Sequence, residues 1–356
     1  MTAFEAQLAR IEARPRTWLV TGAAGFIGSH LVEALLARGQ AVVGLDNFAT
    51  GSRENLEAVR AALGEAPWRR FRFLEGDIRA PEACREACRG VQLVLHQAAL
   101  GSVPRSLEDP VASNEANVSG FLNMLVAARD AGVERLVYAS SSAIYGDHPG
   151  LPKVEDAIGR PRSPYALTKR VNELYAEVFA ACYGLDTVGL RYFNVFGPRQ
   201  SPHGPYAAVI PAFVGALFAG TQAWINGDGS AARDFCHVDN AVQANLLAAT
   251  VEDRSALNQA YNVAVGEQTS ISRLFELVRR SVAGHRPQAA AARPAYRAPR
   301  RGDVPFSRAD VSKAERLLGY RATVRLEEGL ARTVQWYAGR LLGPSQDETQ
   351  GRMSYA

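Results

Sequence analysis

The chain places a tyrosine and a lysine four residues apart, Tyr165 and Lys169, in a segment with helical spacing. Positions i and i+4 share one face of a helix, so the lysine ammonium can lie beside the tyrosine phenol. A free tyrosine has a pKa of about 10 and is a poor base at neutral pH. A neighbouring cation favours the phenolate and brings that pKa toward the working range. The pair is therefore predicted to take a proton from a substrate hydroxyl while hydride leaves the same carbon, although such a spacing is more often only an amphipathic helix face.

Three serines, Ser140 to Ser142, end a predicted strand some 25 residues before this pair. In an open α/β sheet, ligands gather at the carboxyl ends of the strands. A hydroxyl there can bond the same substrate oxygen as Tyr165 and relay its proton. Serine-rich strand ends are also common turn formers, but the Tyr-Lys pair makes a catalytic serine the better interpretation.

Gly22, Gly25 and Gly28 form a GxxGxxG turn roughly 140 residues before the tyrosine. Small residues let a backbone approach a pyrophosphate, and the next helix offers free N–H groups and a positive dipole end. This spacing is looser than the GxGxxG fingerprint and alone indicates little. Asp46 strengthens it, because it ends the next predicted strand 18 residues past Gly28. An acid there bonds adenosine ribose hydroxyls and repels a 2′-phosphate, which favours NAD over NADP. Asp77 follows the third strand and is interpreted either as an adenine contact or as a solvated turn residue.

Strands alternating with helices are expected to position these residues. Apolar runs predict strands at 17–21, 41–46, 72–74, 91–96, 136–140 and 187–192. Helical spacing predicts helices at 25–38, 121–131 and 209–220. This alternation is typical of an α/β protein with a doubly wound, parallel Rossmann sheet.

After residue 190 the pattern becomes less regular, which predicts a smaller, discontinuous α/β substrate domain. The segments 235–238 and 261–264 are expected to return to the main sheet. The predicted divisions are a helical extension at 1–16, an NAD-binding domain at 17–190 plus 234–264, a substrate-binding domain at 191–233 plus 265–342, and a tail at 343–356.

Composition excludes several other classes. The 356 residues carry 40 basic and 36 acidic side chains, and a formal charge of +4 is too mild to indicate a nucleic-acid partner. The four cysteines form no CxxC or zinc pattern, so no metal is expected and the thiols should be reduced. No apolar run reaches the roughly 18 residues of a spanning helix, and no signal peptide precedes the first strand. The protein is expected to be cytoplasmic, with no membrane partner.

With these motifs in place, the chain resembles the extended short-chain dehydrogenase/reductases, and among them the nucleotide-sugar 4-epimerases. The motifs, in family order, are TGAAGFIGSHL (21–31), LDNF (45–48), GDIR (76–79), HQAA (96–99), SSSAIYG (140–146), PYALTK (164–169), LRYFNVFGPRQ (190–200), RDF (233–235) and RRGDV (300–304). Within the family, the segments at 96–106 and 146–156 are especially similar to bacterial UDP-N-acetylglucosamine 4-epimerases of surface-polysaccharide pathways such as O-antigen synthesis.

The resemblance implies a role for each matching residue. The implied catalytic residues are Ser141, Ser142, Tyr165 and Lys169. The implied NAD contacts are Gly22, Gly25, Phe26, Ile27, Gly28, Asp46, Asn47, Asp77, Ile78, Gln97, Ala98, Ala99, Asn117, Tyr165, Lys169 and Tyr192. The implied substrate contacts are Gly101, Ser102, Ser142, Asn194, Val209, Asn226, Arg233, Arg300, Asp303 and Ser307. Two of these, Arg233 and Arg300, match arginines that hold the UDP diphosphate, which suits guanidinium geometry.

The implied reaction is NAD-dependent epimerisation of UDP-N-acetylglucosamine at C4 through a 4-keto intermediate, in a homodimer. Ser307 aligns with a position that is bulky in enzymes restricted to unsubstituted hexoses, and Gly101 replaces a larger residue of the glucose-type enzymes. Both leave room for an acetamido group. UDP-N-acetylglucosaminuronate or UDP-glucose remain alternative substrates, and Arg105 and Arg191 are cations that could serve either structure or diphosphate.

Three rival classes remain. A dehydratase or decarboxylase of this fold needs a carboxylate beside the catalytic hydroxyl, whereas Ser142, Ala143 and Ile144 follow Ser141 here. A net dehydrogenase shares the Tyr-Lys pair but does not need two arginines for a diphosphate. A nucleotide-binding protein without catalysis should have lost Tyr165 or Lys169, and both are present.

Overall fold

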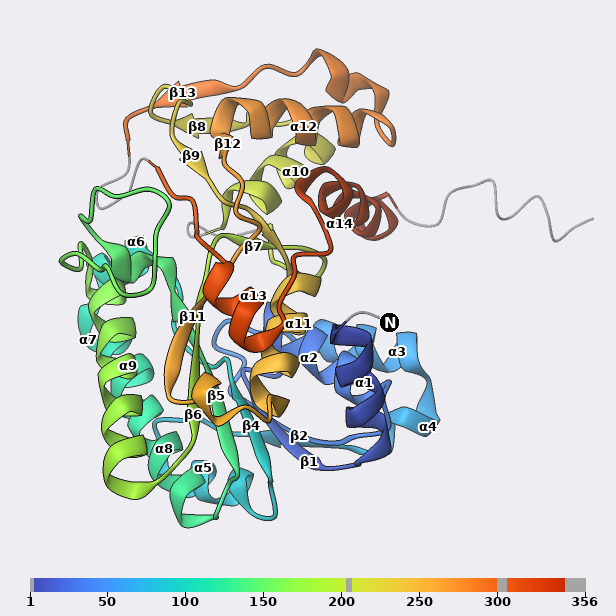
Figure 1. The fold of residues 1–356 in the computed structure, drawn as a ribbon. Coiled ribbons are helices and arrows are strands. Elements are labelled where there is room, and N and C mark those ends of the chain that lie inside the picture. The colour runs from blue at the N-terminus through green and yellow to red at the C-terminus, as the bar shows by residue number, and fades with distance from the viewer. Residues whose placement is uncertain (1–2, 203–206, 300–305, 343–356) are drawn as a thin grey trace, which may run out of the picture.

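A seven-stranded, wholly parallel sheet forms the centre of the computed structural model, which describes residues 3–202, 207–299 and 306–342 (Figure 1). Its strands are β1 (Thr17–Thr21), β2 (Ala41–Asp46), β3 (Phe71–Glu75), β4 (Leu93–His96), β5 (Arg135–Ser141), β6 (Thr187–Tyr192) and β11 (Gln259–Val263). The spatial order β3-β2-β1-β4-β5-β6 reverses direction at β1, where ligands bind in doubly wound sheets. The predicted Rossmann fold is confirmed.

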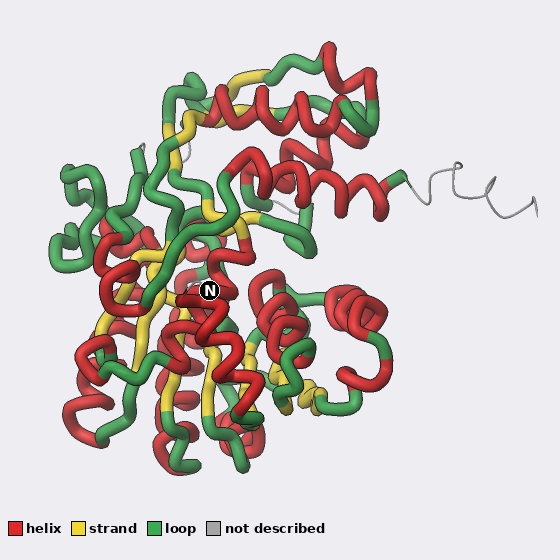
Figure 2. The backbone as a smooth tube through the Cα atoms, turned by 45° about the vertical axis from the view of Figure 1, so that its right-hand side comes forward, coloured by secondary structure: helices red, strands yellow, loops and turns green. Residues whose placement is uncertain are grey.

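Helices cover both faces of this sheet (Figure 2). One core contains side chains of α1 (Ala3–Ala13), α2 (Phe26–Leu36), α3 (Arg53–Leu63), α11 (Val238–Thr250) and α13 (Ser312–Leu318). The other contains side chains of α5 (Pro81–Cys88), α8 (Gly120–Asp130) and α9 (Pro164–Tyr183). Because neighbouring side chains of a strand point to opposite faces, Trp18 and Val20 pack in the first core and Leu19 packs in the second.

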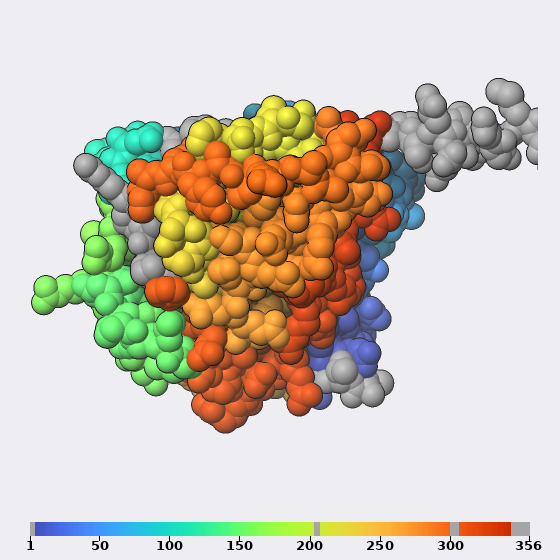
Figure 3. Space-filling view, turned by 90° about the horizontal axis from the view of Figure 1, so that it is seen from above, coloured from blue at the N-terminus to red at the C-terminus, as the bar shows by residue number. Residues whose placement is uncertain are grey.

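A smaller region lies above the sheet in Figure 1, and its yellow to red elements cover most of the face seen in Figure 3. It contains α10 (Val209–Ala219), α12 (Ile271–Ala283), α14 (Leu326–Leu341) and the strand pairs β8 (Trp224–Asn226) with β13 (Ala295–Arg297) and β9 (Ala232–Arg233) with β12 (Thr269–Ser270). Its core is separate from the two cores of the sheet, and Phe213 meets Phe275 edge to face within it.

Short elements connect these layers and carry part of the site. They are the helices α4 (Glu65–Trp68), α6 (Val103–Glu108) and α7 (Pro110–Asn114), and the turns η1 (Glu115–Ser119), η2 (Ser142–Tyr145), η3 (Arg254–Ala256) and η4 (Pro287–Ala291). No helix among the described residues is both long enough and apolar enough to cross a membrane. All four cysteines are free thiols.

Of the two segments expected to return to the main sheet, only one does so. Residues 261–263 of the segment at 261–264 lie in β11, beside β6, as predicted. The segment at 235–238 does not: β10 (Cys236–His237) pairs with β7 (Val195–Phe196) in a separate two-stranded sheet. It is too short to join the large sheet, because α11 begins at the next residue.

The region assigned to the substrate domain also contributes to the large core. Ala314, Leu318 and Tyr320 pack in the core that covers one face of the sheet. The predicted segment 265–342 therefore contributes side chains both to the smaller region and to the core of the sheet.

Candidate active site

The glycine turn between β1 and α2 can admit only glycine at critical points. Gly22 has φ +67°, and a Cβ on Gly28 would lie 1.9 Å from the Gly22 carbonyl oxygen. Helix α2 therefore packs directly on the turn. Its N-cap residue, Gly25, supplies no side-chain cap, so the first N–H groups of the helix face the cleft without a side-chain acceptor. Free N–H groups at a positive dipole end fit a pyrophosphate.

Asp46 lies at the carboxyl end of β2, beside this turn. Its two oxygens accept one backbone N–H each, from Ala24 at 3.0 Å and from Phe48 at 2.7 Å. A carboxylate can accept about four hydrogen bonds, so capacity remains for ribose hydroxyls. Burial raises the pKa of this carboxyl, and the backbone hydrogen bonds oppose that change. The turn and Asp46 together fit a dinucleotide.

Tyr165, the predicted base, is held by the start of α9. Ser163 caps the helix by accepting the Ala166 N–H at 3.1 Å, and Pro164 occupies its first turn, where no N–H is needed. Tyr165 hydrogen-bonds with Ser141 at the end of β5. The Ser141 hydroxyl also accepts the Ala143 N–H at 3.1 Å, which opens η2. The predicted serine and tyrosine are therefore in direct contact.

Lys169 lies one turn further along α9, on the predicted face. Its Nζ is 6.0 Å from the Tyr165 ring centroid and donates to the Ala139 carbonyl at 2.7 Å. Burial lowers the pKa of Lys169 to about 8. Burial also raises the pKa of Tyr165, and the hydrogen bond from Ser141 offsets this only in part. The expected lowering of the tyrosine pKa does not hold for the protein alone, because desolvation outweighs the hydrogen bond from Ser141.

A cavity of about 820 Å³ joins these parts. The predicted site residues that line it are Gly22, Gly25, Phe26, Ile27, Gly28, Asp46, Gln97, Ala98, Ala99, Gly101, Ser102, Ser141, Ser142, Tyr165, Lys169, Tyr192, Asn194, Arg233 and Ser307. Its described lining also includes five basic side chains, namely Arg105, Lys153, Arg162, Lys169 and Arg233, against one acidic side chain, Asp46. This balance favours a polyanionic ligand.

A second cavity of about 220 Å³ adjoins it, because Asn194 and Arg233 line both. Val209 and Asn226, which were predicted to contact substrate, line this second cavity together with Trp224. An aromatic side chain, an amide and an arginine in one small cavity suit a planar base attached to a phosphate.

Four predicted cofactor residues lie outside the large cavity's lining. Asn47 donates to Asp77 at 2.7 Å, and the Asp77 carboxylate also accepts from Arg79, which lowers its pKa to about 2. Ile78 is buried. Asn117 is buried as well, and bonds both backbone groups of Leu100 and the Thr168 hydroxyl. Contacts of these four with NAD stay predictions, as do those of Arg300 and Asp303, which lie outside the described residues.

Gln97 and Tyr192 are joined through a residue that the sequence did not indicate, Asn245 on α11. The Tyr192 hydroxyl donates to Gln97 Oε1 at 3.1 Å and accepts from Asn245 Nδ2 at 2.7 Å. Gln97 Nε2 donates to Asn245 Oδ1 at 3.0 Å. This closed ring of hydrogen bonds fixes both side chains in the cavity wall.

Other residues of the site were also missed. Gln200 lines the cavity, and its buried side-chain oxygen has no hydrogen-bond partner among the described residues. Its place at the end of the motif at 190–200 was the only signal. The buried Asp234 carboxylate accepts N–H groups of Val265, Gly266 and Ala309, which ties the strand of Arg233 to the segment after Ser307. No local pattern indicates these long-range partners.

No group of three or more His, Cys, Asp or Glu side chains is placed to hold a metal ion in the part of the chain that the structure describes.

Comparison with known proteins gives consistent matches. Residues 18–264 match the NAD dependent epimerase/dehydratase family. The chain is 38% identical over 324 residues to a UDP-glucose 4-epimerase of Mycolicibacterium smegmatis, covering 90% of this chain and 98% of that protein.

Two solved structures illustrate the same similarity. One is a UDP-N-acetylglucosamine 4-epimerase from Methanobrevibacter ruminantium M1 in complex with UDP-N-acetylmuramic acid (TM-score 0.83, 35% identity, 92% of this chain and 99% of that one). The other is a UDP-glucuronic acid 4-epimerase from Bacillus cereus with UDP-glucuronic acid and NAD (TM-score 0.81, 28% identity, 91% and 99%). Since these relatives are named for three different sugars, overall similarity does not separate the substrates.

Proposed function

Because the chain belongs to the NAD dependent epimerase/dehydratase family, we propose that it is a UDP-sugar 4-epimerase that interconverts UDP-N-acetylglucosamine and UDP-N-acetylgalactosamine. One observation carries this proposal. A single cavity of about 820 Å³ has the dinucleotide turn and Asp46 at one part of its wall, Ser141, Tyr165 and Lys169 at another, and Arg233 and Ser307 at a third.

NAD, when bound, supplies the acceptor of the C4 hydride and returns hydride to the same carbon. The protein supplies the proton chemistry and the orientation. Tyr165 takes the proton of the 4′-hydroxyl at its phenol oxygen and later returns it. Ser141, which bonds the phenol, holds the substrate oxygen in line with it. The buried Lys169 ammonium stabilises the phenolate.

Epimerisation requires the 4-keto sugar to present its other face without leaving the enzyme. Binding energy at the nucleotide end permits this, because it holds the ligand far from C4′. Arg233 lines both cavities, and we expect it to bind the diphosphate that joins the base-bearing end of the ligand to the sugar. The sugar then turns in the wider cavity, whose wall near Ser142 and Gly101 is formed by small residues.

The cavity argues against a dehydratase or a decarboxylase. Those reactions need a carboxylic acid near the catalytic hydroxyl. Among the described lining residues the only carboxylate is Asp46, which lies beside the glycine turn and is engaged by Ala24 and Phe48.

Three observations support the N-acetyl sugar. A Cβ on Gly101 would meet nothing within 4 Å, so the wall is open there. Ser307 is a small polar residue of the same wall. The unpartnered Gln200 oxygen can accept an N–H donor such as that of an acetamido group.

A second candidate substrate is UDP-N-acetylglucosaminuronate. Arg105, Lys153 and Arg162 line the cavity in addition to Arg233, and a hexuronate carries one more negative charge than a neutral sugar. Lys153 is buried and donates to the His148 carbonyl, so its charge is held in place. These cations favour an acidic sugar if they lie at its C6 end.

Proton NMR of reactions with separate UDP-sugars tests the proposal. The purified protein is incubated without added NAD with UDP-N-acetylglucosamine, UDP-glucose or UDP-N-acetylglucosaminuronate. The 4-epimer should appear fastest from UDP-N-acetylglucosamine. A faster reaction with the uronate would keep the reaction and change the substrate. No turnover of any sugar, even with NAD supplied, would refute the epimerase.

We also propose an oligomeric state and a cellular role for the protein. The second copy in a homodimer would cover the exposed apolar positions Leu167, Leu174 and Val178 of α9. The subgroup resemblance supports a cytoplasmic role in supplying activated amino sugar for surface polysaccharide.

A further inference from the structure

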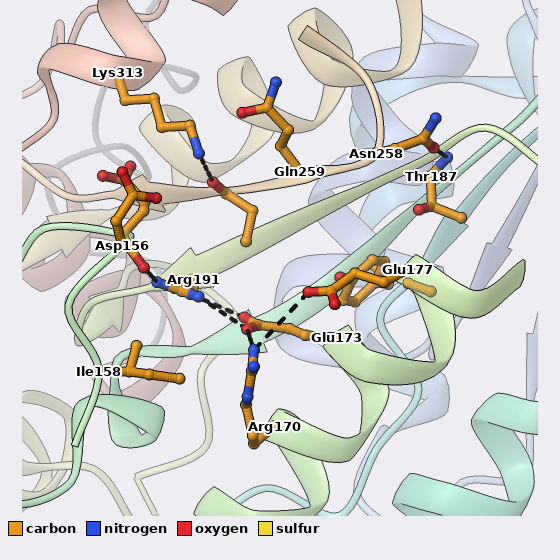
Figure 4. Close-up of a pocket in the computed structure, with 14 residues that line it drawn as sticks. Asp156, Ile158, Arg170, Glu173, Glu177, Thr187, Arg191, Asn258, Gln259 and Lys313 are labelled. Carbon is orange, nitrogen blue, oxygen red and sulfur yellow. Dashed lines mark hydrogen bonds and ion pairs between the residues drawn. The ribbon is translucent and has the colours of Figure 1, made fainter. Parts of the chain in front are cut away.

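Glu173 lies one turn beyond Lys169 on α9, and its side chain is only 2% exposed. Arg191 of β6 is similarly buried and binds it with two hydrogen bonds, from Nε to Oε1 and from Nη2 to Oε2, both 2.9 Å long. Figure 4 shows the two side chains facing each other in the wall of a separate cavity of about 370 Å³. Arg191, whose charge could serve either structure or a diphosphate, is held by this pairing away from the sugar cavity.

The ion pair reaches the catalytic strand through Ser140. Ser140 and Arg191 are register partners in neighbouring strands, so their side chains point to the same face of the sheet. The Ser140 hydroxyl donates to Glu173 Oε1 at 2.7 Å. Ser140 itself lines the sugar cavity, so the pair lies directly behind the cavity wall.

Three consecutive residues of β5 are thereby bound to three consecutive turns of α9. The Ala139 carbonyl accepts from Lys169, and Ser141 bonds Tyr165. Ser140, which lies between Ala139 and Ser141 in the strand, donates to Glu173. Positions 165, 169 and 173 share one helix face, so this ladder fixes how α9 lies on the strand that carries the catalytic serine.

Arg191 also fixes the other end of the serine segment. Its Nη1 donates to the Tyr145 hydroxyl at 3.1 Å and to the Glu155 carbonyl at 2.7 Å. The Tyr145 hydroxyl in turn donates to Asn262 of β11 at 2.6 Å. The Arg191 guanidinium that binds Glu173 therefore also holds the turn that follows Ser141.

We propose that Glu173 and Arg191 are a positioning pair, which holds Ser141 and Lys169 at Tyr165 while cancelling each other's charge behind the site. The inference rests on the proposed epimerase function. A buried ion pair is weak evidence for stability, because apolar replacements are often as stable. The hydrogen bonds to Ser140 and Tyr145 instead give the pair a specific geometric role.

The charged and titratable groups around the pair are few. Arg170 of α9 contacts Glu173 at 3.2 Å and Glu177 at 4.0 Å. Tyr138 of β5, Tyr145, Glu155 and Asp156 of the loop before α9, and Lys313 of α13 line the same cavity or contact the pair. On the catalytic side, His96 of β4 is fully buried near Lys169, and its lowered pKa of about 3 keeps it neutral at neutral pH.

Glu173→Gln tests the pair because it keeps the shape and removes one charge. Positions 165 and 173 are about 12 Å apart along the helix axis, and the guanidinium left uncompensated beside position 173 then favours the Tyr165 phenolate over a similar range, so the acid limb of kcat should move down by about half a pH unit to one unit. We expect kcat to fall about tenfold or more, with KM within about twofold. The double variant Glu173→Gln/Arg191→Met removes the extra charge, so its acid limb should return to the wild-type position while kcat stays low.

Glu177→Gln is the matched control, since Glu177 also lies near Arg170 on α9 but is exposed. It should leave kcat within about twofold and the acid limb in place. If Glu173→Gln does not fold, Glu173→Asp is tested in its place. It keeps the negative charge but shortens the side chain, so the hydrogen bond to Ser140 is lost and kcat should fall. A wild-type kcat for Glu173→Asp, or an unmoved acid limb for folded Glu173→Gln, would overturn the proposal.

The wild-type enzyme in the same assay separates the two proposals. If the wild-type enzyme shows no turnover, the proposed epimerase function is refuted, but the proposed role of Glu173 and Arg191 is not. In that case the Tyr165 phenol is titrated by ultraviolet difference absorbance against Tyr165→Phe. The pair predicts a lower phenol pKa in Glu173→Gln than in the wild type, and an equal value would refute it.

Discussion

Tyr165 and Lys169 are buried groups whose pKa values burial moves in opposite directions. Burial raises the pKa of Tyr165 and lowers that of Lys169 to about 8. In the protein without ligand, both changes favour the uncharged forms of these two side chains. The phenolate therefore depends on the charges that surround it, namely Lys169, the ligand and the state of the pair behind Ser140.

Replacing Tyr165 by phenylalanine should remove the base without changing the shape of the cavity. We expect kcat to fall by about 10²- to 10⁴-fold, the usual contribution of a positioned acid or base, with KM nearly unchanged. Turnover of UDP-sugar followed by NMR measures both constants. Tyr183→Phe, at the exposed end of the same helix, is the matched control. Retention of more than a tenth of wild-type kcat by Tyr165→Phe would assign the base to another group.

Replacing Lys169 by methionine should abolish activity and raise stability at neutral pH. The folded protein holds Lys169 with a pKa of about 8 against 10.5 for the free side chain. Between these values the unfolded state binds more protons, so stability rises with pH, and below pH 8 the full cost of about 3 kcal/mol applies. The lost bond to Ala139 offsets part of the gain.

Thermal unfolding of nucleotide-free protein between pH 7 and 10.5 checks this prediction. The melting temperature of Lys169→Met should exceed that of the wild type at pH 7, and the difference should shrink toward pH 10.5. A difference that is constant over this range would mean that the buried charge carries no cost.

At the scale of elements, we expect the contact between α2 and its glycine turn to control cofactor binding. Gly28→Ala would place a Cβ 1.9 Å from the Gly22 oxygen and so push the helix from the turn. We expect purified Gly28→Ala to contain at least tenfold less NAD, measured by chromatography after release from the denatured protein. Gly339→Ala in α14 is the control, because nothing lies within 4 Å of its Cβ. Full NAD content in Gly28→Ala would show that the turn does not hold the cofactor.

Elements with strong local patterns were predictable. The run at 41–46 is apolar, lies between a helix end and an acid, and matches β2 residue for residue. The segment at 235–238 has the same apolar character, yet it forms a two-residue strand with β7. Its outcome depends on α11 beginning at Val238 and on a partner some 40 residues earlier. Neither is visible in local hydrophobicity.

The same limit applies to the site. The YxxxK spacing placed Tyr165 and Lys169 on one helix face because that relation is local. The partner of Arg191 was not predictable, since Glu173 lies on another element and is selected by the register of β5 and β6. The Gln97–Asn245–Tyr192 ring was missed for the same reason.

At the scale of the whole molecule, an apolar stripe on α9 suggests self-association. Leu167, Leu174 and Val178 are spaced by seven and four residues, lie on one helix face, and are 44–54% exposed. Sedimentation should give a dimer for the wild type and a monomer for Leu174→Glu/Val178→Glu. Leu341→Glu, at an exposed leucine of α14, should remain dimeric. A monomeric wild type would refute the proposed assembly.

The sheet and the smaller region together enclose one cavity, and the central claim is that oxidation and reduction at one carbon both occur inside it. UDP-N-acetylglucosamine carrying deuterium at C4 tests this most directly, with the product analysed by NMR and mass spectrometry. If the hydride taken from C4 returns to C4, the 4-epimer should keep the label in full, and no reduced nicotinamide or keto sugar should accumulate in solution. Loss of the label to water, or net formation of a keto product, would contradict the account.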